Sequence, residues 1–131
     1  MSRRSWGKSH KYGARTVWAC ENCRQPSPQK GSCPKCGHGL LKFDSKAERD
    51  RWYELALLVD SGRITNLEVQ PRFPIHVAGT EVGRYYGDFR YIDEAGSQRI
   101  EDVKGRDTQL SRFKRKCVAA EYGIEVEVVK K

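Results

Sequence analysis

The chain has 131 residues, of which 37% are hydrophobic and 32% are charged, and its formal net charge is +8. This length leaves room for one modest domain with a small appendage. Because it has no apolar run near the roughly 20 residues that span a bilayer, and no apolar stretch behind its first basic residues, we expect no membrane segment and no secretory signal. The expected location is the cytoplasm.

The positive charge is concentrated in the first third of the chain. Residues 1–43 hold nine Lys or Arg and one acidic residue, whereas residues 44–131 hold sixteen of each kind. A local surplus of this size favours a polyanionic partner, with nucleic acid first and an anionic membrane surface a distant second. A solubilising tail is the alternative. The predicted DNA-binding residues of this region are Arg3, Arg4, Lys8, Lys11, Arg15 and Lys35.

Composition also divides the chain. We predict a disordered basic arm over residues 1–15, a metal-binding knuckle over 16–41 and an α/β domain over 42–131. The knuckle contains two Cys-x-x-Cys pairs, Cys20/Cys23 and Cys33/Cys36, each in a tight turn. Four thiolates with this spacing are typical of a closed, tetrahedral Zn²⁺ site that stabilises a segment too short for its own core. His38 is a possible substitute ligand.

The α/β domain is predicted to begin with a helix that ends at Gly62 and has a capping box, Ser45-x-x-Glu48. Strands follow over residues 64–77, 83–92 and 98–104, with Pro71 and Pro74 indicating an edge or a bend in the first. A second helix over 108–122 has a predicted buried stripe of Leu110, Phe113, Cys117 and Ala120. A last strand over 124–129 is expected to return beside the earlier strands.

Acidic and basic residues meet on two of these strands. Asp102 and Lys104 are two residues apart, so their side chains project from the same face, and a hairpin brings Asp88 close to Asp102. Two carboxylates on adjacent strands can share a hard divalent ion, and a neighbouring ammonium can position a water and stabilise phosphate charge. A cross-strand salt bridge on a solvated face explains the same spacing.

The segments Phe43–Glu48, Val69-Gln70-Pro71, Tyr86-Gly87-Asp88-Phe89 and Glu101-Asp102-Val103-Lys104-Gly105 resemble the PD-(D/E)XK nuclease superfamily. They are similar to small phage-encoded nucleases, TnsA-type transposase nucleases and Holliday-junction resolvases. The resemblance covers residues 43–129 and implies a restriction-endonuclease-like αβββαβ core. Gly87 stands where the family usually has proline.

The resemblance implies roles for individual residues. Asp88, Asp102, Glu48 and the Val103 carbonyl would hold catalytic Mg²⁺ or Mn²⁺, and Lys104 would be the catalytic lysine. Glu48 has an equal explanation as a helix cap, and Glu101 is an alternative to Asp102. On the second helix, Arg112, Lys114, Arg115 and Lys116 could hold the DNA backbone or form a solvated face.

These features predict a metal-dependent DNA endonuclease, and the superfamily resemblance implies 5′-phosphate products. Because nothing in the sequence indicates base readout, we expect selectivity for branched or four-way junction DNA, which a homodimer would cut symmetrically. A TnsA-like or sequence-specific nickase is the second reading. A zinc-knuckle nucleic-acid binder without enzymatic activity is the competing class. If the protein is phage-encoded, its location is the host cytoplasm.

Overall fold

The computed structural model describes residues 16–27 and 30–130. The chain forms two compact units, Met1–Tyr53 and Glu54–Lys131. The predicted basic arm, with Arg3, Arg4, Lys8, Lys11 and Arg15, lies outside the described residues. Within them, no helix is long and apolar enough to cross a membrane.

The first unit is built on a small antiparallel sheet. Strands β1 (Val17–Cys20), β2 (Pro26–Ser27) and β3 (Leu40–Phe43) lie in the order β2-β1-β3. Helix α1 (Lys46–Asp60) follows, and the boundary between the units falls inside it. The Ser45 hydroxyl accepts a hydrogen bond from the Glu48 amide at 3.1 Å, and the Glu48 carboxylate accepts one from the Asp44 amide at 3.3 Å. The Ser45 cap of the predicted capping box is therefore present, and the Glu48 carboxylate bonds the amide of the residue before the cap.

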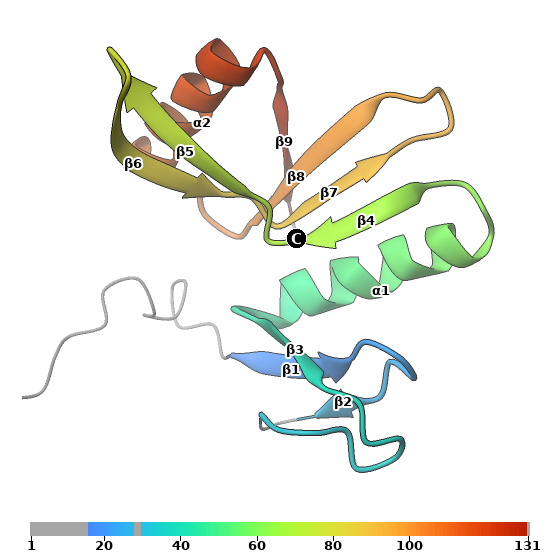
Figure 1. The fold of residues 1–131 in the computed structure, drawn as a ribbon. Helices are drawn as coiled ribbons and strands as arrows, with labels where there is room; N and C mark the ends of the chain where they lie inside the picture. The colour runs from blue at the N-terminus through green and yellow to red at the C-terminus, as the bar shows by residue number, and fades with distance from the viewer. Residues whose placement is uncertain (1–15, 28–29, 131) are drawn as a thin grey trace, which may run out of the picture. The chain divides into compact units, whose positions relative to one another are not determined.

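The second unit contains a four-stranded mixed sheet and a separate hairpin (Figure 1). The sheet has the order β4-β7-β8-β9, in which β8 and β9 are parallel and the other pairs antiparallel. After α1, the elements of the second unit are β4 (Thr65–Val69), β5 (Arg72–Val77), β6 (Thr80–Tyr86), β7 (Phe89–Ile92), β8 (Gln98–Lys104), α2 (Gln109–Tyr122) and β9 (Val126–Lys130). The chain is thus a mixed α/β protein whose last strand returns beside an earlier one, as predicted.

Two predicted strands are each divided by a bend. The strand predicted over 64–77 is β4 and β5, which meet at Gln70 and Pro71, and the one predicted over 83–92 is β6 and β7, which meet at Gly87 and Asp88. Gln70 has a φ of 56°, which takes it out of strand geometry. Together the two bends turn the β5–β6 hairpin away from the β4–β7 pair, as Figure 1 shows.

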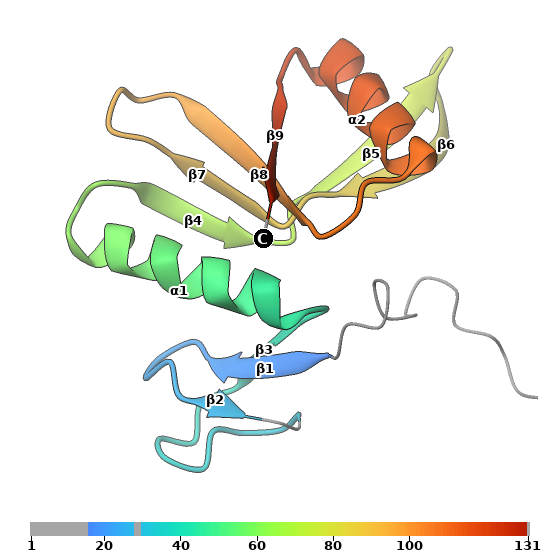
Figure 2. The ribbon, with the colours of Figure 1, turned by 180° about the vertical axis from the view of Figure 1, so that it is seen from behind.

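Helix α2 covers the β5–β6 hairpin, which Figure 2 shows from behind. The predicted ends are confirmed, because the Thr108 side chain caps the helix and Gly123 closes it with a φ of 67°. The predicted buried stripe was largely wrong. Leu110 and Phe113 are each 63% exposed and Ala120 is exposed, while Val118 is fully buried in the core.

The buried side of α2 is displaced by one residue from the predicted stripe. It runs through Ser111, Arg115 and Val118, which recur at helical spacing. Two of these three residues are polar, so apolar periodicity could not indicate this side. Cys117 alone of the predicted stripe is partly buried, and it packs against the core of Phe73, Ile75, Tyr85, Ile100 and Val118.

Gly87 explains why this chain has no proline before Asp88. Its N–H donates a hydrogen bond to the Pro71 carbonyl at 3.0 Å, which a proline nitrogen could not do. A Cβ at this position would also lie 3.3 Å from side-chain atoms of Ile100 and Pro71. The bend therefore depends on a residue that has both an N–H and no side chain.

We predict that Gly87→Pro lowers the free energy of unfolding by about 2–5 kcal/mol, because it removes this hydrogen bond and overpacks the bend. Gly87→Ala should have a smaller effect, since it keeps the N–H. Gly83→Ala is the matched control, because a Cβ there meets no atom within 4 Å. Urea unfolding measures all three; equal stability of Gly87→Pro and Gly83→Ala would contradict the prediction.

Candidate functional site

The four cysteines of the first unit come together. Their sulfur atoms all lie within 4.8 Å of one another, with Cys20 and Cys36 at 3.4 Å and Cys23 and Cys33 at 3.5 Å. Four ligands at the usual Zn–S distance of about 2.3 Å around a tetrahedral ion are separated by about 3.8 Å. The cluster could therefore hold zinc with little rearrangement, and His38 is not part of it.

The turns around the cysteines direct backbone amides at sulfur. The Cys23 amide donates to Cys20 Sγ at 3.3 Å, and the Lys35 amide donates to Cys33 Sγ at 3.4 Å. A hydrogen bond from the His38 backbone lowers the pKa of Cys36 to about 5. Because the thiolate is the form that binds metal, this backbone hydrogen bond favours the ligand form of Cys36.

The acidic site of the second unit centres on Asp102, which is 2% exposed on strand β8. Its Oδ1 lies 3.3 Å from the Lys104 ammonium, and its Oδ2 accepts a hydrogen bond from the Tyr85 hydroxyl. Burial, followed by the charge of Asp102, raises the pKa of Tyr85 strongly, so the phenol keeps its proton and remains a donor. Both carboxylate oxygens are thus held in place.

Asp88 lies at the bend between β6 and β7 and faces the next strand. Its Oδ2 accepts a hydrogen bond from the Val103 amide at 2.6 Å, and its own amide donates to the Glu101 carbonyl at 2.9 Å. These bonds place the Asp88 carboxylate beside the backbone that separates Asp102 from Lys104. No third carboxylate, histidine or thiol of the described second unit joins the two aspartates in a three-ligand group.

Glu101 occupies a different environment from its neighbour Asp102. It is 1% exposed, and its Oε2 accepts a hydrogen bond from the Tyr91 hydroxyl at 2.5 Å. Successive residues of a strand point to opposite faces, so the Tyr85–Asp102 pair and the Tyr91–Glu101 pair lie on opposite sides of β8. Lys104 pairs with Asp102, as the spacing indicates.

Arg115 and Asp107 extend the acidic site. The Arg115 guanidinium donates to both Asp107 oxygens at 2.5 and 3.1 Å and to Ser111 Oγ at 2.7 Å, and it lies 4.0 Å from Asp102 Oδ2. The Arg115 hydrogen bonds hold the pKa of Asp107 below its usual range. Arg115, which the sequence offers as a DNA contact, has a side chain only 12% exposed and joins Asp107 to Asp102.

The remaining predicted residues have separate surroundings. Glu48 belongs to the first unit, where its side chain is buried and contacts the helix start. Its role as a metal ligand stays a prediction. Lys35 is exposed in the second cysteine turn, and on α2 Arg112 and Lys116 are exposed while Lys114 is partly buried. Sequence reasoning missed Tyr85 and Asp107, because neither position carries a pattern of its own.

We predict that the protein binds about one Zn²⁺ per chain through its four cysteines. Cys20→Ser combined with Cys33→Ser should abolish binding, because it removes one thiolate from each pair. Elemental analysis of purified protein measures the metal. Cys117→Ser is the control, since Cys117 packs against the core of the other unit and should retain full zinc content. Zinc-free wild-type protein would contradict the prediction.

The comparisons with known proteins give one match. Residues 30–130, well over half of the chain, match DUF1064, a family described as a protein of unknown function. This range includes the whole acidic site and the second cysteine pair. No curated protein and no solved structure matches the chain. The chain therefore belongs to the DUF1064 family.

Proposed function

We propose that this protein is a metal-dependent DNA endonuclease whose active site contains Asp88, Asp102 and Lys104. The observation that carries the proposal is the burial of the Asp102–Lys104 pair, whose side chains are 3% and 14% exposed. A solvated surface salt bridge, the plain alternative, does not fit these values. Buried ion pairs are costly to desolvate and are weak stabilising devices, so they are often retained for chemistry.

The donor set fits a hard divalent ion. Asp88, at the bend before β7, and Asp102, on β8, offer carboxylate oxygens, and the Val103 carbonyl lies between Asp102 and Lys104. With two carboxylates in this unit, water and phosphate oxygens would complete the coordination. When bound, Mg²⁺ or Mn²⁺ would polarise the scissile phosphate and lower the pKa of an attacking water.

The residues of the chain then have distinct tasks. Lys104, held at 3.3 Å from Asp102, is placed to orient the attacking water and to offset negative charge that develops on the phosphate. The Tyr85 hydroxyl fixes Asp102 from the other oxygen. Arg115, neutralised in part by Asp107, adds positive charge 4.0 Å from the same carboxylate. Such fixed groups reduce the reorganisation that the reaction requires.

A restriction-endonuclease-like core is part of this proposal. The elements run helix, five strands, helix, strand, because two of the three predicted strands are each divided in two. The parallel return of β9 beside β8 supports the proposed core. We further propose branched or four-way junction DNA as substrate, 5′-phosphate products and a homodimer for symmetric cutting. The support is the charge surplus of residues 1–43 and the absence of any evident base-reading element in the sequence. A TnsA-like or sequence-specific nickase is the variant within this class.

A second candidate is a nucleic-acid binder without enzymatic activity. It is favoured by one observation: among the described residues, the cysteine cluster is the one assembled group of three or more metal ligands. In that case zinc would stabilise the knuckle, and Lys35 and the basic residues of the arm would hold phosphates. Metal-dependent cleavage separates the two functions.

We predict that the protein cuts DNA with Mg²⁺ or Mn²⁺ and that Asp102→Asn lowers the cleavage rate by about 100-fold or more, because it weakens metal binding. Glu101→Gln is the matched control: it is the neighbouring buried acid, bonded to its own tyrosine. Cleavage of four-way, flap and linear DNA is measured side by side with each protein, and circular dichroism checks that both variants fold.

Three results would decide against parts of the proposal. Intact DNA of every kind with both metals would leave the binding protein as the function. Full cleavage by folded Asp102→Asn would remove Asp102 from the site while the enzyme class survives. If folded Glu101→Gln loses cleavage while Asp102→Asn keeps it, Glu101 would replace Asp102 as the proposed active-site carboxylate.

A further inference from the structure

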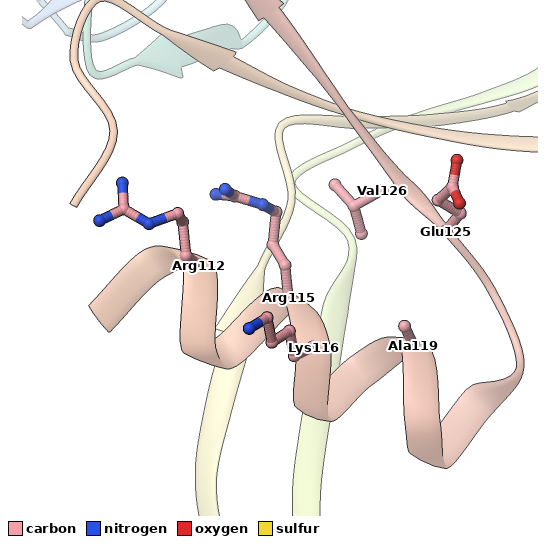
Figure 3. Close-up of a pocket in the computed structure, with 6 residues that line it drawn as sticks. All are labelled: Arg112, Arg115, Lys116, Ala119, Glu125 and Val126. Atoms are coloured by element: carbon pink, nitrogen blue, oxygen red, sulfur yellow. The ribbon is translucent and has the colours of Figure 1, made fainter. Parts of the chain in front are cut away.

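A basic hollow lies between helix α2 and the start of strand β9. It has a volume of about 260 Å³ and is lined by Arg112, Arg115, Lys116, Ala119, Glu125 and Val126. Figure 3 shows the three basic side chains on α2, with Glu125 and Val126 on the chain that enters β9. Most of the lining surface is apolar, and its charged groups are three cations and one carboxylate, a balance that favours an anion over a cation.

One of the three cations is already engaged. Arg115 donates two hydrogen bonds to Asp107 and one to Ser111, and its side chain is 12% exposed. It therefore forms a fixed wall of the hollow. The same guanidinium lies 4.0 Å from Asp102, so Arg115 belongs to both the hollow and the acidic site.

The other two cations are available to a ligand. Arg112 is 51% exposed, and its contacts to Asp107 are long, 3.5 Å to the carbonyl and 4.0 Å to the carboxylate. Lys116 is exposed and forms no ion pair within residues 16–27 and 30–130. The two are four residues apart, so they are neighbours on one helix face, where like charges repel. An anion between them would relieve this repulsion.

We propose that this hollow binds a backbone phosphate of DNA, next to the phosphate that is cut. The guanidinium of Arg112 offers a planar pair of donors and the Lys116 ammonium a compact charge, a combination that suits phosphate oxygens. Ala119 and Val126 contribute apolar surface beside them. The proposal rests on the proposed function for the identity of DNA as the ligand. It assigns Arg112 and Lys116 to DNA binding and Arg115 to positioning Asp102.

The experiment measures DNA affinity without cleavage. Fluorescence anisotropy of a labelled four-way junction is recorded in EDTA over a range of NaCl concentrations, with Arg112→Gln, Lys116→Gln, the double variant and Lys114→Gln. Each hollow variant should weaken binding and reduce the slope of log Kd against log[salt] by about 1, as the loss of one phosphate contact does. Lys114→Gln removes the same charge from the same helix outside the hollow and should change the slope by less than half as much.

If all three single variants weaken DNA binding equally, the effect is general charge attraction and the proposal is overturned. It is also overturned if none of them changes DNA binding. A second arm titrates inorganic phosphate and follows amide signals of Ala119 and Val126 by NMR. Phosphate binding here with unchanged DNA affinity of the double variant would assign the hollow to a free phosphate and also overturn it.

The two proposals fail separately. If no DNA is cut but the hollow variants lose more affinity than Lys114→Gln, the hollow stands and the nuclease does not. If Asp102-dependent cleavage occurs while the hollow variants bind like Lys114→Gln, the nuclease stands and the hollow does not.

Discussion

Buried charge needs partners, and strand β8 carries two neighbouring carboxylates that are almost fully buried, Glu101 and Asp102. An unpaired ion at either position would cost several kcal/mol. Partners are present on both faces of the strand. The Tyr91 hydroxyl donates a hydrogen bond to Glu101, and Asp102 accepts one from the Tyr85 hydroxyl and forms an ion pair with Lys104. Tyr85 belongs to β6, which pairs with β5 outside the main sheet, so its hydrogen bond to Asp102 links the hairpin to strand β8.

The bend at Gly87 and Asp88 separates β6 from the main sheet. A straight continuation would keep β6 paired in the sheet, whereas the bend turns it into a separate hairpin with β5. The backbone groups at the bend are still bonded, since the Gly87 amide donates to Pro71 and the Val103 amide donates to the Asp88 side chain. The Asp88 carboxylate, a candidate metal ligand, thus accepts the hydrogen bond that a backbone carbonyl would otherwise accept from Val103. A substitution of Asp88 would therefore affect both the site and the stability of the fold.

Local sequence patterns predict part of this architecture, and the rest depends on contacts between residues far apart in the chain. The cysteine spacing, the Ser45 cap, the extent of the second helix and the strand over 98–104 are local patterns, and each is found in the structure. The division of two strands at their bends depends on contacts between distant residues, although Pro71 indicates where one bend falls. The buried side of α2 was misjudged because it includes the polar residues Arg115 and Ser111, which are hydrogen-bonded to each other, and Arg115 also bonds Asp107.

The candidate site is predictable to a similar degree. The ion pair of Asp102 and Lys104 follows from strand periodicity, but the tyrosine and arginine that surround it come from other elements and have no spacing that reveals them. Burial is the decisive information, since it distinguishes Asp102–Lys104 from an ordinary surface pair. Exposure of individual side chains is set by the whole fold, and no local pattern contains it.

Arg115 has one more consequence. Its guanidinium touches Asp107, lies within 4.0 Å of Asp102 and forms part of the hollow beside β9. A change of charge at Asp102 alters the field that Arg115 experiences, and an anion in the hollow alters the field at Asp102. Binding at two such places is thermodynamically linked, and the linkage is reciprocal: whatever factor one ligand gains from the other, the other gains from the first. A cation at Asp102 and an anion beside Arg115 would each strengthen the binding of the other. The affinity of the acidic site for a cation therefore depends on whether the hollow is occupied, and the affinity of the hollow for an anion depends on the acidic site.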